Sequence, residues 1–238
     1  MRVTEIWRFP VKSMAGETLL AAEIGELGIV GDRGWSIYDV DTAMTLTARR
    51  TPELLFASAR VVDHELVITL PDGRTIDESG HGEVSAWLGR TVEIRSAGDA
   101  DLDAGGTYET PLDVDNDADW VSWQGPGGAF HDSSRTRVSL VSEVTLREWD
   151  RRRFRTNVIV DDGGEDDLVG GRIAIGDVGL NVTKQVDRCA MVTRPQPGLD
   201  RDLAVLKTIN AERATFLAVG CLVESPGELA LGDEVRRF

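Results

Sequence analysis

Short segments in which apolar and polar residues alternate recur along most of the chain, and most of them end at glycine, proline or aspartate. Residues 3–9 alternate in this way and stop at Pro10. Asp72-Gly73 and Gly176-Asp177 are dipeptides typical of tight hairpin turns. Many short strands joined by frequent turns favour a barrel or a sandwich. We therefore expect a mostly β fold with a few helices, of the α+β class.

The stretch 97–128 differs from the rest because it is rich in Gly, Asp and Pro and has little periodicity. We interpret it as a boundary and a connecting excursion that packs on the body through Trp120 and Trp123. The predicted organisation is a unit over 1–96, the excursion over 97–128 and a second unit over 129–238. Further predicted strands cover 18–24, 35–40, 57–62, 66–70, 74–77, 91–95, 137–141, 157–160, 172–175, 178–183, 217–223 and 229–235, and predicted helices cover 83–88, 143–149 and 201–213.

The chain is strongly acidic, with 41 acidic and 26 basic side chains and a formal net charge of −15. Binding to nucleic acid needs a basic face that neutralises phosphates, so we expect no nucleic-acid partner. No apolar run approaches the roughly 20 residues of a membrane span, and the N-terminus lacks the apolar core of a signal peptide. We therefore expect a cytoplasmic protein with no membrane partner.

Cys189 and Cys221 are the two cysteines, too few for a four-cysteine zinc site or an iron–sulfur cluster. Cys189 follows Arg188 and lies within five positions of Lys184 and Arg194. Cations beside a thiol favour the thiolate, the form that reacts and that binds thiophilic metals. From these residues alone, a buried and inert cysteine is an equally good interpretation. Cys221 lies in an apolar run and is predicted to be core.

Three basic islands lie far apart in the sequence, at 10–16, 31–34 and 151–157. The second is a Gly-rich bend, where backbone N–H groups can face an anion. Each island alone is equally well explained as a turn or a solvated charge run. They can act together only if the two predicted units share a cleft.

Taken in order with Cys189, these islands resemble the MOSC family, named after the C-terminal domain of molybdenum-cofactor sulfurase. Phe9-Pro-Val-Lys-Ser-x-x-Gly16 and Gly31-Asp-Arg-x-Trp35 resemble its companion N-terminal domain. His131-Asp132, Phe154-Arg-Thr-Asn157 and Arg188-Cys189 resemble its MOSC domain. The resemblance covers essentially the whole chain. Among the members of the family, the chain is similar to amidoxime-reducing component proteins. It implies an N-terminal β-barrel-like domain and a MOSC β-barrel domain that share a cofactor cleft.

The resemblance also implies a cofactor, the molybdenum cofactor (Mo-molybdopterin), with the Cys189 thiolate as the protein's ligand to the metal. Lys12, Ser13 and Arg33 are expected to hold its phosphate and pterin. Further cofactor contacts are expected from Ser142, Arg155, Asn157 and Arg188. Where the family commonly has a small polar residue two positions before the cysteine, this chain has Asp187, which we predict to be catalytic as a proton donor.

The function implied by the resemblance is that of a molybdenum-dependent oxidoreductase that removes oxygen from N-oxygenated small molecules. No ferredoxin-like extension follows Phe238, so electrons are expected from a separate donor protein or reductase. A non-catalytic carrier of the cofactor or of its sulfur is an alternative, and a binding module that has lost the metal is another. The family's Phe-Gly-x-Tyr is replaced here by residues 217–220, which predicts a more open pocket.

Overall fold

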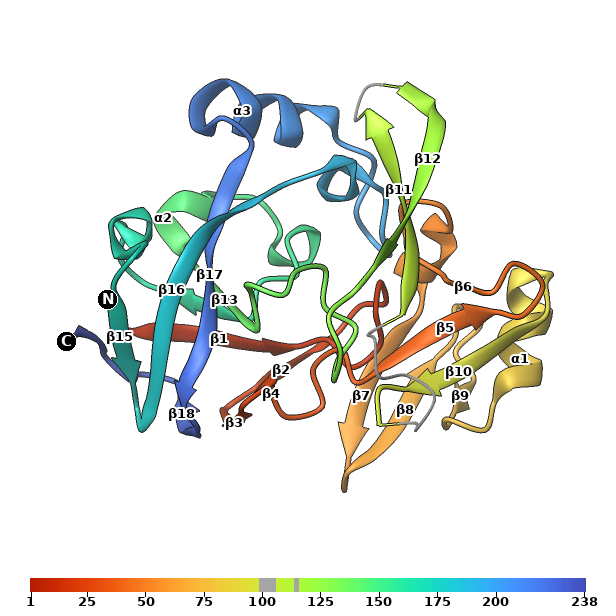
Figure 1. The fold of residues 1–238 in the computed structure, drawn as a ribbon, viewed down its shortest axis with the longest axis horizontal. Helices are drawn as coiled ribbons and strands as arrows, with labels where there is room; N and C mark the ends of the chain where they lie inside the picture. The colour runs from red at the N-terminus through yellow and green to blue at the C-terminus, as the bar shows by residue number, and fades with distance from the viewer. Residues whose placement is uncertain (99–105, 114–115) are drawn as a thin grey trace.

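Strands are the main regular secondary structure of the computed structural model, which describes residues 1–98, 106–113 and 116–238 (Figure 1). Within these residues the α-helices are short: α1 (His81–Leu88), α2 (Glu143–Leu146) and α3 (Leu203–Arg213). The expected mostly β class with a few helices is confirmed. None of the helices in the described ranges has the length and apolar character needed to cross a membrane.

The largest sheet has eight strands and curls into a half-barrel. Its order is β19-β15-β16-β17-β13-β14-β1-β2. The N-terminal strand β1 pairs antiparallel with β14, and β14 pairs in parallel with β13. The first strand of the chain therefore completes a sheet built mainly from the C-terminal half. The bounds are β1 Val3–Arg8, β2 Glu17–Leu19, β13 Val138–Ser142, β14 Val158–Val160, β15 Arg172–Ile175, β16 Val178–Asp187, β17 Phe216–Ser225 and β19 Val235–Arg237.

The middle of this sheet is covered on both faces. All five residues of β13 and all three of β14 are buried. Val138 and Leu140 pack into one apolar cluster, whereas Val141 packs on the other side into a cluster with α3. Successive side chains of a strand point to opposite faces, so a continuous apolar run is what a strand between two layers requires.

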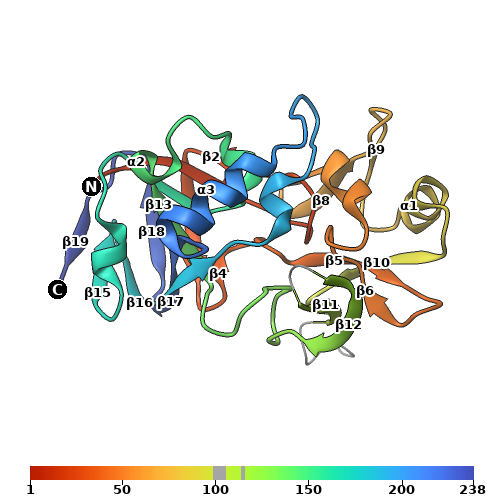
Figure 2. The same ribbon diagram turned by 90° about the horizontal axis from the view of Figure 1, so that it is seen from above.

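The remaining strands form smaller sheets beside the half-barrel (Figures 1 and 2). One of them joins C-terminal β18 (Gly227–Ala230) to β3 (Ala21–Gly25), so the two halves of the sequence are interleaved in space. Two others enclose an apolar core of their own together with α1. β4 (Gly28–Ile29) completes the sheet of β18 and β3. The strands of the two sheets around the second core are β5 Trp35–Asp39, β6 Met44–Thr45, β7 Ser58–Val62, β8 Glu65–Thr69, β9 Thr75–Ile76 and β10 Val92–Ser96.

A two-stranded hairpin, β11 (Thr107–Asp113) and β12 (Asn116–Gln124), lies in the predicted excursion (Figure 2). The sequence predicts no regular structure there, because the segment lacks apolar alternation. The strands pair through backbone hydrogen bonds and through the stacked rings of Tyr108 and Trp123 instead. Residues 99–105 and 114–115 of the excursion lie outside the described part of the chain. The division at 96 and 128 stays a prediction.

Several predicted elements are shorter than expected or are split, and two of them have a clear backbone cause. The helix over 143–149 ends at Leu146, because Arg147 has a positive φ of 54° that is incompatible with a right-handed helix. The strand over 229–235 is split into β18 and β19 by a turn at Gly232, whose φ is 87°. Short 3-10 helices fill connections at Pro52–Phe56 (η1), Arg151–Arg153 (η2), Glu165–Leu168 (η3) and Ala190–Thr193 (η4).

Candidate functional site

A cavity of about 420 Å³ is lined by residues from both halves of the sequence. The segment after β1, the bend before β5 and the segment before β14 all contribute to it, and so does the end of β16. The three basic islands and the segment around Cys189 therefore meet at one place. Predicted site residues in the lining are Lys12, Ser13, Arg33, Arg155, Asn157, Asp187, Arg188 and Cys189.

Lys12 is buried at the base of the cavity, only 4% exposed. Its Nζ donates hydrogen bonds to the carbonyl oxygen of Phe130 at 3.0 Å and to Oδ1 of Asp132 at 2.7 Å. The same nitrogen lies 4.3 Å from the centroid of the Tyr108 ring. Next to it, Ser13 has a positive φ of 70°, and its hydroxyl accepts a hydrogen bond from the backbone N–H of Ala48. This turn is thus held from three separate segments.

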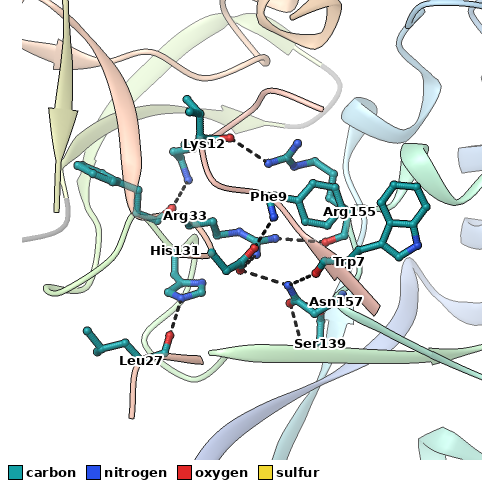
Figure 3. Close-up of polar contacts among 12 residues, drawn as sticks. Trp7, Phe9, Lys12, Leu27, Arg33, His131, Ser139, Arg155 and Asn157 are labelled. Carbon is teal, nitrogen blue, oxygen red and sulfur yellow. Dashed lines mark hydrogen bonds and ion pairs between the residues drawn. The ribbon is translucent and has the colours of Figure 1, made fainter. Parts of the chain in front are cut away.

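Asn157 joins the two halves of the molecule beneath the cavity (Figure 3). Its Nδ2 donates to the carbonyl oxygen of Trp7 at 3.3 Å and to Oδ2 of Asp32 at 3.2 Å. Its Oδ1 accepts from the backbone N–H and the hydroxyl of Ser139. Asp32 also accepts from the backbone N–H of Phe9 and pairs with Arg33. Buried polar groups are stable only when paired in this way, so the network has one defined arrangement.

Arg33 and Arg155 stack beside the Phe9 ring, with guanidinium carbons 5.6 and 4.4 Å from its centroid. Arg33 donates to the carbonyl oxygen of Arg155 at 3.2 Å, and Arg155 donates to the carbonyl oxygen of Met14. Burial, together with repulsion from Arg33, lowers the pKa of Arg155 to about 9. Burial also lowers the pKa of Lys12, and the nearby Arg33 and Arg155 contribute. These cations are therefore held close together at a cost that a bound anion would offset.

We call Lys12, Asp32, Arg33, Arg155 and Asn157 the floor of the cavity. Two further groups adjoin it, His131 and Asp132. Nε2 of His131 lies 3.1 Å from the carbonyl oxygen of Leu27, which can only accept, so this nitrogen carries the proton. Burial and the charge of Arg33 lower the pKa of His131 to about 4. Its ring is therefore neutral at physiological pH.

Asp132 points into the open cavity, and 82% of its side-chain area is exposed. The surrounding walls alone would raise the pKa of this carboxyl group. The ion pair with Lys12 has the opposite effect, reinforced by Arg33 and Arg49, and it holds the pKa well below its ordinary range. Asp132 therefore stays ionised and partly balances the cations around it.

Arg188 connects the floor to the cysteine. Its guanidinium donates to the carbonyl oxygens of Leu217 and Phe154 at 2.7 and 2.8 Å, and to the hydroxyl of Thr156 at 3.1 Å. Burial lowers its pKa to about 10. Because all three of these contacts go to protein oxygens, Arg188 fixes the end of β16 against the floor.

Cys189 lies just beyond the end of β16, is partly exposed and is the N-cap residue of the 3-10 helix η4. Burial alone would lower the pKa of Arg49, but the sulfur of Cys189, with which its guanidinium interacts directly, raises it above its ordinary value. Asp187 is 63% exposed and pairs with Lys184 at 3.4 Å. We call Lys184, Asp187 and Cys189 the rim of the cavity.

Arginines 152 and 153 hold the loop that follows Cys189. Arg153 donates to the carbonyl oxygens of Val192 and Arg194 at 3.3 and 3.2 Å, and to that of Asp200 at 2.7 Å. Arg152 donates to the carbonyl oxygen of Pro197 at 2.9 Å. The arginines of the third basic island therefore have two roles. Arg152 and Arg153 hold this loop, whereas Arg155 belongs to the floor.

Ser142 does not reach the cavity, and this prediction is corrected. It lies at the far end of β13, where its hydroxyl accepts a hydrogen bond from the backbone N–H of Thr145 and caps α2. Ser139, at the near end of the same strand, lines the cavity instead. A strand rises about 3.3 Å per residue, so Ser139 and Ser142 lie about 10 Å apart along β13. This distance separates a residue that lines the cavity from one that caps α2.

Gly220 does not open the pocket as the sequence predicts. A Cβ atom placed on it would lie 2.3 Å from the hydroxyl of Thr136, and Thr136 lines the cavity. The position is therefore filled by a neighbouring side chain. At Ala218, two residues earlier, the backbone keeps a φ of 92°, a conformation that favours glycine.

The sequence-based prediction missed Arg49, Tyr108 and Trp123, which all line the cavity. Arg49 follows β6 in a segment without a motif, and only its proximity to Cys189 in space gives it a role. The two aromatic residues lie in the segment interpreted as a connection. Their spacing in sequence carries no signal, because they pair only when the hairpin forms.

Comparison with known proteins finds a family model that matches each half of the chain. A family model described as MOSC N-terminal beta barrel domain matches residues 1–107, and one described as MOSC domain matches residues 124–236. The chain is 24% identical to mitochondrial amidoxime reducing component 2 of Rattus norvegicus, over 99% of this chain and 83% of that protein. It is 23% identical to molybdenum cofactor sulfurase of Danio rerio, over 92% of this chain but only 31% of that protein.

Two solved structures are also similar. The YuaD protein from Bacillus subtilis matches with a TM-score of 0.42 and 13% identity, over 98% of this chain and 93% of that one. YiiM from Geobacillus stearothermophilus matches with a TM-score of 0.37 and 13% identity, over 56% of this chain and 72% of that one. Because the two family models span most of the sequence, this chain belongs to the MOSC family, with an N-terminal MOSC beta barrel domain followed by a MOSC domain.

Proposed function

We propose that the protein binds the molybdenum cofactor in this cavity and uses it to reduce N-oxygenated small molecules. The MOSC family is associated with that cofactor, and one similar protein is named an amidoxime reducing component. The observation that carries the proposal is the meeting of buried cations with a partly exposed thiol in one cavity, although they come from opposite ends of the sequence.

The side chains present fit a phosphorylated pterin that holds its own metal. Lys12, Arg33 and Arg155 are donors for a phosphate, and their crowding is relieved when an anion binds. No group of three or more His, Cys, Asp or Glu side chains in the described ranges is arranged to hold a metal ion. A metal at this site must therefore bring most of its ligands with it, and the Cys189 thiolate supplies a soft one.

Each residue has a distinct proposed role. Lys12, Ser13, Arg33 and Arg155 bind the phosphate and pterin, and Asn157 fixes the surface on which they lie. Arg188 and Arg49 position the thiolate of Cys189. When bound, the cofactor supplies the two-electron redox chemistry that removes oxygen from nitrogen. Reduction of an amidoxime to an amidine consumes two electrons and two protons and releases water.

Asp187 is our candidate for delivering those protons, because its carboxyl group lines the cavity two residues before the thiol. Electrons come from a separate donor protein or reductase that approaches the partly exposed rim. We place the protein in the cytoplasm. These three assignments extend the sequence-based predictions.

Reduction of benzamidoxime by chemically reduced, molybdenum-loaded protein tests the proposal. Wild-type protein should form benzamidine, whereas Cys189→Ala should lose activity by several orders of magnitude, because the metal loses its protein ligand. Asp187→Asn should lower kcat by roughly 10²-fold or more, with the molybdenum content unchanged. Cys221→Ala, which alters a buried cysteine in the core, is the matched control and should stay active.

The same experiment separates the alternatives. Wild-type protein that holds molybdenum but turns over no N-oxygenated substrate would favour a carrier of the cofactor or of its sulfur. That reading is supported by the accessibility of Cys189. Protein that takes up no molybdenum when the cofactor is supplied would favour a binding module that has lost the metal.

A further inference from the structure

The hairpin β11–β12 gives the cavity an aromatic wall that the proposed function does not yet use. Tyr108 and Trp123 both line the cavity and lie directly opposite each other across the hairpin. Their ring centroids are 5.4 Å apart, and the ring planes meet at 27°. The two rings are therefore stacked on each other, and the outer ring of the pair is the one that a ligand can meet.

The stack begins at Lys12 of the floor and continues through Tyr108 to Trp123. Tyr108 is only 3% exposed, and the Nζ of Lys12 lies over its ring. Burial raises the pKa of Tyr108 well above its ordinary value, so its ring stays neutral. Trp123 follows as the outer ring and is 37% exposed. An indole that packs one face on a neighbour and leaves area open in a cavity is a preformed stacking surface.

Trp123 is not what anchors the hairpin to the body. Side chains alternate along a strand, so Trp120 and Trp123 point to opposite faces of β12. The guanidinium carbon of Arg50 lies 4.0 Å from the centroid of the Trp120 ring, and Arg50 also pairs with Glu109 at 2.9 Å. The Trp120 side of the hairpin thus contacts the body, while Trp123 remains available to a ligand.

We propose that Trp123 is a specificity-determining residue, which selects substrates whose N-oxygenated group is attached to a planar, conjugated ring. A flat ring can lie in offset stacking against the indole, whereas a puckered ring of similar size meets it with only a few atoms. The inference rests on the proposed function, because it requires a small-molecule substrate in this cavity.

Binding of two amidines tests this without turnover. Benzamidine and cyclohexanecarboxamidine carry the same charged group on a planar and a puckered ring, and both lack the oxygen that would react. Isothermal titration of the molybdenum-loaded protein should show benzamidine binding roughly tenfold tighter, as expected for an aromatic stack. In Trp123→Leu the two affinities should become equal, whereas Trp123→Phe should keep most of the difference.

Trp120→Leu is the matched control, because it removes the same side chain from the other face of the same strand. It should leave the preference for benzamidine unchanged. The inference is overturned if wild-type protein binds both amidines equally or binds neither, if Trp123→Leu keeps the preference, or if Trp120→Leu abolishes it. Failure of the proposed function has a different signature: protein that prefers benzamidine but never reduces benzamidoxime.

Discussion

The floor and the rim of the cavity are built in opposite ways. In the floor, Lys12, Asp32 and Asn157 are almost fully buried, and each makes at least two hydrogen bonds or ion pairs to other segments. At the rim, Asp187 is largely exposed, and its pairing with Lys184 is a single contact at 3.4 Å. The floor is fixed by its network, while the rim is held mainly through the backbone of β16.

This difference matches two separate roles, anion binding for the floor and contact with a substrate or redox partner for the rim. Groups that bind an anion work best when they are already in place, because no reorganisation is then required on binding. Groups that meet a substrate or a redox partner must stay accessible. Substitutions in the floor should therefore cost stability and cofactor together, whereas substitutions at the rim should leave stability unchanged and alter reactivity or, at Cys189, the metal that is bound.

The largest expected effect is that of Asn157→Ala. It removes four buried hydrogen bonds, those that the side chain donates to Asp32 and to the carbonyl oxygen of Trp7 and the two that it accepts from Ser139, so the free energy of unfolding should fall by about 4 kcal/mol. Urea denaturation followed by circular dichroism measures this. Asn181→Ala, at an exposed asparagine of β16, is the control and should change stability by less than about 0.5 kcal/mol. If the two variants lost similar amounts of unfolding free energy, the floor would be no more important for stability than the exposed surface.

A pH dependence should follow from His131. Its folded pKa of about 4 lies below the ordinary 6.5, so the unfolded chain binds a proton first as the pH falls. The folded state should then lose about 3 kcal/mol of stability between pH 7 and pH 4 through this residue alone.

His131→Gln keeps a donor for the carbonyl oxygen of Leu27 but cannot titrate. Its stability should decline less steeply than that of wild type across the same pH range. Parallel pH profiles for the two proteins would show that His131 is not a buried neutral group beside the floor.

A smaller gain is expected from Ala218→Gly in β17, next to the carbonyl oxygen that anchors Arg188. Ala218 has a φ of 92°, so glycine should relieve backbone strain and raise the unfolding free energy by about 1 kcal/mol. Ala59 is also a buried strand alanine, but it does not have a positive φ, so Ala59→Gly should be destabilising instead. Thermal denaturation of both variants decides this, and a loss in each would exclude strain at Ala218.

The smallest effect on stability should come from the rim. Asp187→Asn removes one exposed ion pair, so the free energy of unfolding should change by less than about 0.5 kcal/mol. Chemical denaturation of this variant beside Asn157→Ala gives the contrast directly. A change of several kcal/mol in Asp187→Asn would show that the rim is part of the structural network.

Strand positions were the most predictable part of the fold, because alternation and turn dipeptides are local signals. The hairpin around Gly176-Asp177 and the helix before Arg213 are confirmed within a few residues. Which strands pair was not predictable. The insertion of β1 beside β14 depends on contacts between residues more than 150 positions apart, and no local pattern records it.

The site was predictable where a motif carried it and not elsewhere. Lys12, Arg33 and Cys189 were found because their neighbours form motifs, and the fold brings them to one cavity. Ser142 was assigned by motif alone, but its position along β13 turns it away to cap α2. Trp123 enters the site through a hairpin whose strands lack apolar alternation, so periodicity could not reveal it.

Molybdenum content tests the central claim most directly. Protein produced with cofactor supply should carry about one molybdenum per chain by elemental analysis, and Cys189→Ala should lose most of it, since a soft thiolate is the metal's protein ligand. Cys221→Ala should keep the wild-type content. Wild-type protein without molybdenum, or a Cys189→Ala variant that retains all of it, would contradict a thiolate-anchored cofactor on a cationic floor.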